Sequence, residues 1–169
     1  MMQALLKKVH ENDILILNSQ NVTSFQELND GVEVVANGIS FKTNKVLFAT
    51  NGFAAELTNN QVQPARAQVL ITKPIANLAI KGTFHLDKGY YYFRNINNRI
   101  LFGGGRNLDF EGETTTSHET TNLIQNSLEE ILKTVILPHN NFEIEHRWSG
   151  TMGIGNQKNP IVKQLSNHV

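Results

Sequence analysis

Hydrophobic positions change their period several times in the first fifty residues. A stripe at the spacing i, i+3, i+4, i+7 predicts an amphipathic helix over Met2, Leu5, Leu6 and Val9. The runs DILIL (13–17) and KVLFA (45–49) are apolar without alternation, a pattern typical of strands that helices cover on both faces. Between these runs, Asn37-Gly38 separates two β-rich segments and predicts a hairpin over 31–43.

The rest of the chain shows the alternation of an antiparallel sheet. Strands are predicted in ARAQVLITKP (65–74), which Pro74 closes, and in FEIEHRWSG (142–150). Between them, two β-segments are joined by the turn NINN (95–98), with an earlier turn at 87–89.

One long helix is predicted before the last of these strands. Thr116 and Glu119 have the spacing of a capping box, and Pro138 ends the element. Its apolar stripe recurs at i, i+4, i+7, i+11, at Ile124, Leu128, Ile131 and Val135. The elements together predict an α+β fold: an antiparallel sheet with one long helix, preceded by part of an α/β sheet.

Composition narrows the class of protein. A chain of 169 residues with 40% hydrophobic and 18% charged residues has the values of a folded globular protein. Fifteen basic and fifteen acidic residues cancel, which argues against nucleic acid or an anionic membrane as a partner. Thiolate sites are excluded because cysteine is absent, and six histidines without pairing or carboxylate clusters predict no metal site. No apolar run approaches the ~20 residues of a membrane span, and we expect a cytoplasmic protein.

The corner ATNG (49–52) is a first candidate site, because an apolar run ends there in side chains that can hydrogen-bond a ligand. In open α/β sheets, ligands lie beyond the carboxyl ends of the strands, and Gly52 would let backbone approach a ligand closely. An ordinary strand-to-helix turn, with Thr50 or Asn51 as N-cap, explains the same residues.

The stretch GYYYFRN is a second candidate. Strand alternation places Tyr90, Tyr92 and Arg94 on one face, and Tyr91 and Phe93 on the other. Two phenols beside a guanidinium could line a pocket for an anionic or planar ligand. The alternative is a solvent-facing arginine beside aromatic cross-strand packing.

Two glycine-rich stretches complete the set. HRWSGTMGIG (146–155) could place backbone against a planar ring, or could be a turn over a core tryptophan. LFGGGRN (101–107) fits neither phosphate-loop pattern, and its glycines predict close backbone packing or approach to a flat ligand. Ser149 lacks the G-x-S-x-G setting of a hydrolase nucleophile.

Taken in order, these segments resemble the FAD-dependent amine and amino-acid oxidoreductases of the D-amino-acid oxidase and glycine/sarcosine oxidase superfamily. The resemblance covers nearly the whole chain and rests on NVTSF, ATNGF, PARAQVLIT, YYYFRN…RILFGGG and HRWSGTMG…NPIV. It implies a parent protein that oxidises a C–N bond of a small amine or amino acid by hydride transfer to FAD.

The resemblance also implies roles for single residues. Contacts with FAD fall to Val22, Ala49, Thr50, Asn51, Gly52, Arg66, Gln68, Trp148, Gly150 and Met152. Substrate contacts fall to Tyr92, Arg94 and Tyr90, and no catalytic acid or base is implied. The implied division is a partial FAD-binding portion over 1–63, a substrate-binding sheet over 64–147, and a return into the FAD-binding portion over 148–169.

Two departures from the family pattern matter. The G-x-G-x-x-G fingerprint and the glycine-rich segment that follows NPIV are absent, so we interpret the chain as a fragment that does not retain FAD. Its exposed apolar edge would favour self-association. Met152 stands where several α-amino-acid oxidases carry an arginine for the substrate carboxylate, so either Arg94 takes that task or the substrate lacks an α-carboxylate.

Two rival functions remain open. One is a non-catalytic α+β binding or interaction module, in which Tyr92 and Arg94 would point to open solvent. The other keeps the flavin and makes the substrate a modified tRNA base, against which the neutral charge of the chain argues.

Overall fold

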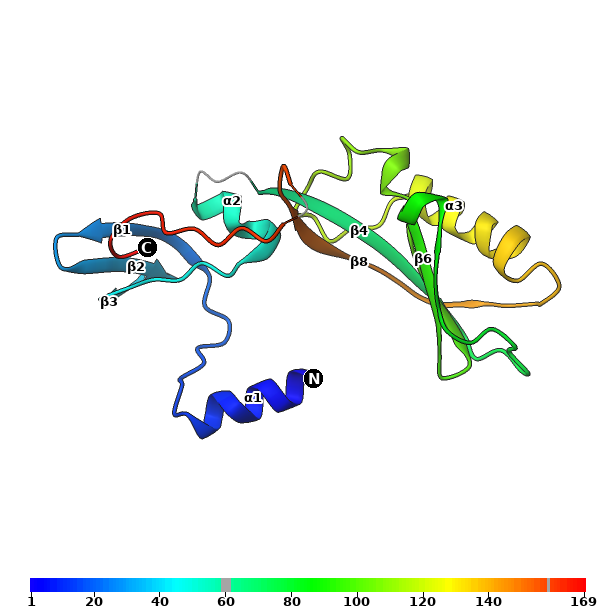
Figure 1. Cartoon of the computed structure of the whole chain (residues 1–169), viewed down its shortest axis with the longest axis horizontal. Helices are drawn as coiled ribbons and strands as arrows, with labels where there is room; N and C mark the ends of the chain where they lie inside the picture. Colours follow the sequence, from blue (N-terminus) through cyan, green and yellow to red (C-terminus); the bar gives the residue numbers. More distant parts are fainter. Residues whose placement is uncertain (59–61, 158) are drawn as a thin grey trace. The chain divides into compact units, whose positions relative to one another are not determined.

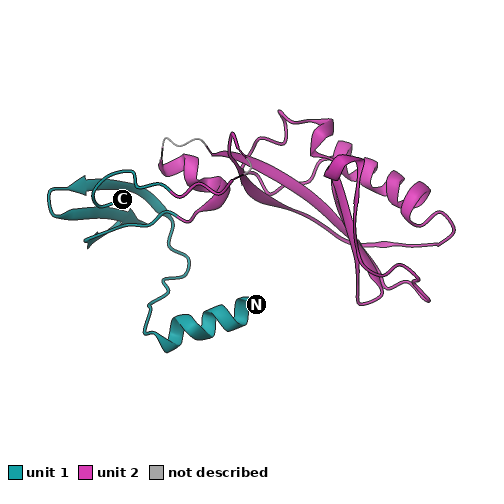
Figure 2. Cartoon of the chain, in the orientation of Figure 1, with its two compact units in different colours: residues 1–48, 163–169 teal, residues 49–162 magenta. Residues whose placement is uncertain are grey.

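The chain folds into two compact units (Figure 2). Unit 1 holds residues 1–48 and 163–169, and unit 2 holds residues 49–162. Both contain antiparallel sheets, and the predicted α+β class is confirmed. The units are defined by packing alone, so the predicted division into FAD-binding and substrate-binding portions stays a prediction. The computed structural model describes residues 1–58, 62–157 and 159–169.

Unit 1 consists of one helix and a three-stranded antiparallel sheet in the order β1-β2-β3 (Figure 1). The predicted hairpin is confirmed: Asn37 and Gly38 both have positive φ, 47° and 78°, as a type I′ turn requires. The predicted N-terminal helix is confirmed as well. The elements are α1 (Met2–Glu11), β1 (Val22–Leu28), β2 (Gly31–Ala36) and β3 (Ile39–Thr43).

Neither of the two apolar runs that were predicted as buried strands forms a strand. Residues 13–17 and 45–49 lie outside the strands, and Leu47 is 90% exposed. An apolar run without alternation indicates that its residues are buried in the folded protein. A strand forms, however, only where a neighbouring strand can hydrogen-bond to it. In the described part of the chain, no strand pairs with either run. The prediction was therefore wrong about their conformation in this chain.

Unit 2 is built on a five-stranded antiparallel sheet in the order β5-β6-β7-β4-β8 (Figure 1). The predicted strands and the turn at 87–89 are confirmed, and the turn predicted at 95–98 is shorter, because Asn95 and Ile96 still belong to β6. The long strand β4 pairs with the central strand β7 on one side and with the edge strand β8 on the other. The bounds are β4 (Gln63–Thr72), β5 (Thr83–Leu86), β6 (Tyr91–Ile96), β7 (Arg99–Gly104) and β8 (Ile144–Ile154), with the short helices η1 (Asn51–Phe53), α2 (Ala54–Leu57), η2 (Asp87–Gly89) and η3 (Arg106–Leu108).

The long helix packs on one face of this sheet (Figure 1). It comprises α3 (Asn122–Ile131) and a π-helical continuation, η4 (Leu132–Ile136), and it stops before Pro138, as predicted. The core between helix and sheet contains Leu70, Phe102, Ile124, Leu128 and Leu132. Across the described residues, no helix is long and apolar enough to cross a membrane.

Two details of the helix prediction were wrong. The helix begins at Asn122, because the backbone N–H of Thr121 donates to the Gln68 side chain and residues 115–119 form side-chain-capped turns. The C-terminal stripe also shifts, because the wider π turn points Val135 outward, where it is 59% exposed. Ile136 is buried in its place.

The burial pattern of the helix predicts a large effect of one truncation on stability and a small effect of another. Leu128→Ala should lower the free energy of unfolding by about 2–5 kcal/mol, because Leu128 is fully buried and the substitution leaves a cavity. Val135→Ala should change it by less than about 0.5 kcal/mol. Urea titrations followed by circular dichroism compare the two, and equal losses would contradict the observed helix register.

Candidate functional site

The sheet of unit 2 leaves the face opposite α3 uncovered within that unit. Strand pairing aligns one residue from each strand across this face: His85, Tyr92, Gly103, Val69 and Trp148. Alternation adds Gly150 and Met152 of β8, Arg94 of β6 and Leu101 of β7 to the same surface. We call it the open face.

Five predicted site residues meet on the open face, three on β8 and two on β6. Trp148 is 43% exposed and Met152 is 41% exposed, so β8 presents apolar surface to the outside. Gly150 lies between them, and a Cβ added there would meet no atom within 4 Å. This strip therefore offers a flat apolar surface with room above the backbone. The alternative of a turn over a core tryptophan does not hold, because 146–154 is strand and Trp148 points outward.

Tyr92 lies flat across the open face because its neighbour is a glycine. A Cβ at Gly103 would stand 2.8 Å from the Tyr92 Oη and 2.3 Å from Cγ1 of Val69. The ring therefore covers the position where another side chain would stand. Burial of the ring raises the pKa of Tyr92 above its ordinary value, so the phenol stays protonated and able to donate a hydrogen bond.

Arg94 shares this face with Tyr92, as alternation predicted, while Tyr91 and Phe93 are buried against the helix. The other four arginines donate hydrogen bonds to described side chains or backbone. Arg94 makes no such bond or ion pair with any residue that the structure describes. Tyr90 lies before β6 in the chain, and its ring stands edge-on to Phe110 at 6.2 Å, so it does not extend the strand surface.

The ATNG corner is joined to β8 by the Asn51 side chain. Its Oδ1 accepts from the Gly153 N–H at 2.7 Å, and its Nδ2 donates to the Thr151 carbonyl at 3.3 Å. Gly52 is required for this approach, because a Cβ there would lie 2.6 Å from the Met152 carbonyl oxygen. Neither Thr50 nor Asn51 caps a helix through its side chain, so the corner is not an ordinary N-cap turn. Two predicted cofactor segments, 49–52 and 148–152, are therefore in contact.

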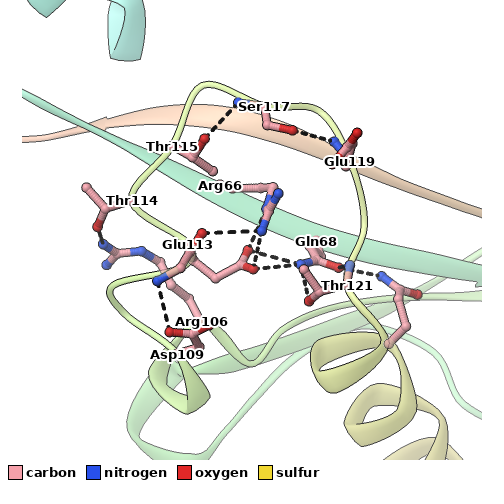
Figure 3. Close-up of polar contacts among 12 residues, drawn as sticks. Arg66, Gln68, Arg106, Asp109, Glu113, Thr114, Thr115, Ser117, Glu119 and Thr121 are labelled. Atoms are coloured by element: carbon pink, nitrogen blue, oxygen red, sulfur yellow. Dashed lines mark hydrogen bonds and ion pairs between the residues drawn. The ribbon is translucent and has the colours of Figure 1, made fainter.

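Arg66 and Gln68 point to the helix side of β4, away from the open face (Figure 3). The carboxylate of Glu113 accepts from Arg66 Nε at 2.9 Å and Nη2 at 2.7 Å, and from Gln68 Nε2 at 2.9 and 3.0 Å. These hydrogen bonds raise the pKa of Arg66 above its ordinary value. Both side chains are engaged on this side of β4, and their predicted contact with FAD stays a prediction.

The residues that complete this buried network were not predicted from the sequence. Thr121 and Gln125 bind the Gln68 amide, and Arg147 joins by donating to Gln125 at 2.8 Å. Glu113 lies in an irregular loop with no periodicity, so its pairing with β4 depends on tertiary contacts that no local pattern announces. Its position between GGGRN and the helix was the only indication in the sequence.

The glycine-rich stretch GGGRN does not form a phosphate loop. The glycines of GGGRN end β7, and the Gly105 N–H donates to the Tyr90 carbonyl at 3.0 Å, so its backbone is used in packing. No group of three or more His, Asp or Glu side chains that could hold a metal occurs in the described ranges. Val22 opens β1 in unit 1, and its predicted contact with the adenine stays a prediction.

The sequence of the chain matches a known protein family, and its fold matches known structures. The model of the FAD dependent oxidoreductase family matches residues 1–169. The chain belongs to this family. Its fold is similar to L-proline dehydrogenase from P. horikoshii, with a TM-score of 0.77 and 20% identity over 98% of this chain and 46% of that one.

Two further structures share the fold. Glycine oxidase from Geobacillus kaustophilus has a TM-score of 0.73 and 14% identity over 91% of this chain and 41% of that one. Iminodiacetate oxidase from Chelativorans sp. BNC1 has a TM-score of 0.73 and 15% identity over 99% of this chain and 46% of that one. The chain thus spans less than half the length of these family structures. No curated protein matches its sequence.

The contact between Asn51 and β8 predicts that the backbone at Gly153 opens more often when the contact is removed. Asn51→Gly keeps the positive φ of 51° but removes both side-chain hydrogen bonds, so the Gly153 amide should exchange with deuterium about tenfold faster. Asn97→Gly is the matched control, because Asn97 also has positive φ, of 48°. Unchanged exchange at Gly153 in Asn51→Gly would disprove the contact.

The buried carboxylate predicts a large loss of stability. Glu113→Gln should cost about 3–5 kcal/mol, because it leaves the Arg66 guanidinium, 6% exposed, without its counter-charge. The control is Glu143→Gln, which breaks an exposed ion pair with Lys73 and should cost far less. Chemical denaturation measures both, and comparable losses would show that burial does not govern the Arg66–Glu113 pair.

Proposed function

We propose that the chain forms the substrate-side portion of an FAD-dependent amine or amino-acid oxidoreductase, with the flavin ring against the β8 strip of the open face. The observation that carries this proposal is the shared surface of Trp148, Gly150, Met152, Tyr92 and Arg94. It unites an apolar strip for a planar ring with a free guanidinium for a substrate, in a chain whose family is FAD-dependent.

Each residue then has a defined task. When bound, the flavin supplies the acceptor for the hydride taken from the carbon of the C–N bond. Trp148 and Met152 provide apolar contact and exclude water, and Gly150 leaves the backbone open to the ring. Tyr92 offers a neutral hydroxyl, and Arg94 orients an anionic group of the substrate.

The opposite end of the cofactor falls to the predicted segment at Ala49–Gly52. The Asn51 contact with β8 supports one part of this assignment, because it brings the 49–52 corner to the strand that carries the flavin strip. The sequence contains no G-x-G-x-x-G to hold the pyrophosphate at a helix N-terminus, so we propose that this chain by itself does not retain FAD.

Trp148 is the only tryptophan of the chain, so its fluorescence reports directly on the open face. Riboflavin, which carries the isoalloxazine without the adenine, should quench Trp148 emission saturably. Gly150→Val should abolish this quenching by placing a branched side chain in the open space, whereas Lys133→Ala, on the helix, should not.

N-acetyltryptophanamide corrects for light absorbed by the flavin. Quenching that is linear in riboflavin and equal in both variants would refute the flavin surface and favour the non-catalytic binding module. With riboflavin at saturating concentration, an amine substrate should bleach the visible flavin absorbance under anaerobic conditions. Tyr92→Phe should lower kcat/KM about tenfold through the lost hydrogen bond.

A further inference from the structure

The β5–β6 edge of the open face carries four hydrogen-bond donors in a compact block. Thr83 pairs with Arg94, and His85 pairs with Tyr92, in directly opposite positions of the two strands. Side chains in such pairs have Cβ atoms about 5 Å apart, and diagonal neighbours lie about 7–8 Å apart. Four polar side chains from two strands can therefore converge on one small ligand.

None of these four side chains has a partner among the described residues. No hydrogen bond, ion pair or ring contact joins the side chains of Thr83, His85, Tyr92 or Arg94 to the described parts of the chain. The carboxylate of Glu145, on a strand farther across the sheet, is occupied by Arg99 at 2.7 Å. The block is thus a set of free donors with one permanent positive charge.

The two strands that carry the block are fixed from behind. On the opposite face, Phe84 of β5 stacks on Phe93 of β6, with ring centroids 4.7 Å apart and an interplanar angle of 13°. The Asn95 side chain also accepts from the Gly82 N–H at 2.8 Å, which holds the start of β5. The donors therefore stand on a preorganised surface, which lowers the entropic cost of binding.

The chemistry of the block favours a carboxylate over a phosphate. A guanidinium fork pairs with a carboxylate through two parallel hydrogen bonds, and hydroxyl and imidazole groups can serve its remaining lone pairs. Phosphate sites in proteins more often add a helix N-terminus or a backbone nest, and the nearby Gly105 N–H is already used by Tyr90.

The block lies far from the β8 strip, against which we propose the flavin ring lies. Arg94 is on β6 and Met152 on β8, with β7 and β4 between them, so three strand spacings of about 4.8 Å put their backbones at least ~14 Å apart. This separation is well beyond the reach of one arginine side chain. In an α-amino acid, the amine nitrogen and the carboxylate carbon are only ~2.5 Å apart. An acid group on Arg94 and a C–N bond over the β8 strip therefore belong to a longer substrate.

We propose that Thr83, His85, Tyr92 and Arg94 form a carboxylate subsite, and that the substrate is an amine whose acid group is separated from the oxidised C–N bond by a chain of several atoms. The position of the C–N bond rests on the proposed function, whereas carboxylate binding by the block does not. Met152, in place of a second guanidinium, agrees with a substrate that has no acid group at the β8 strip.

The test titrates the chain with succinate at constant ionic strength and follows amide shifts of residues 83–94 by NMR. Arg94→Ala should weaken binding about tenfold or more, Arg94→Lys should weaken it less, and His85→Gln should weaken it about threefold. Lys81→Ala is the matched control, because it removes an exposed cation beside the block, and it should change the affinity less than about twofold. The neutral succinamide should not bind.

Three results would overturn the subsite. An equal loss in Lys81→Ala and Arg94→Ala would reduce it to general electrostatic attraction. Tighter binding of inorganic phosphate than of succinate would reject the carboxylate assignment, and shifts confined to other surfaces would reject the location. The four residues are exposed on the sheet surface, and the NMR spectrum of each variant shows directly that it is folded.

Reduction of saturating riboflavin in the presence of the protein separates this subsite from the proposed function. Arg94→Ala should raise KM about tenfold for an amine with a remote carboxylate and raise it far less for the matching neutral amine. If succinate binds but no amine reduces the flavin, the proposed function fails and the subsite stands. If amines reduce the flavin and Arg94→Ala changes neither substrate, the subsite fails and the function stands.

Discussion

A buried carboxylate governs the arrangement of unit 2. Glu113 is 1% exposed, and a charge in that position is tolerated only because Arg66 and Gln68 supply donors to both of its oxygens. The two donors alternate along β4, which commits that face of the strand to the loop and the N-terminus of α3. The opposite face of β4 is thereby left for the small apolar residues under the open face. The polar layer behind the sheet and the flat surface in front of it are two consequences of one strand's alternation.

Much of unit 2 could be predicted from the sequence because its elements carry local signals. Alternation in YYYFRN correctly separated the exposed Tyr92 and Arg94 from the buried Tyr91 and Phe93. The turn at Asn37-Gly38 and the stop at Pro138 follow from backbone chemistry alone. Such features need no knowledge of distant residues.

What the sequence could not reveal depends on contacts between distant segments. The start of α3 is set by Gln68, more than fifty positions earlier, and this displaces the capping box that Thr116 and Glu119 suggest. The runs 13–17 and 45–49 have the composition of buried strands, but the described chain offers them no ladder. The sequence alone does not show that His85 and Thr83 lie beside Tyr92 and Arg94, because only the strand register places them there.

The contact between Asn51 and Gly153 also bears on how the molecule folds. It joins residues 102 positions apart, so a long loop must close before its hydrogen bonds can form, and such contacts form slowly. Until then, β8 is a bare edge strand whose unpaired N–H and C=O groups could recruit a strand from another molecule. Asn51 supplies one donor and one acceptor at that edge, in the manner of a single-residue neighbouring strand. Once formed, the corner that meets the β8 strip thus also closes part of an exposed sheet edge.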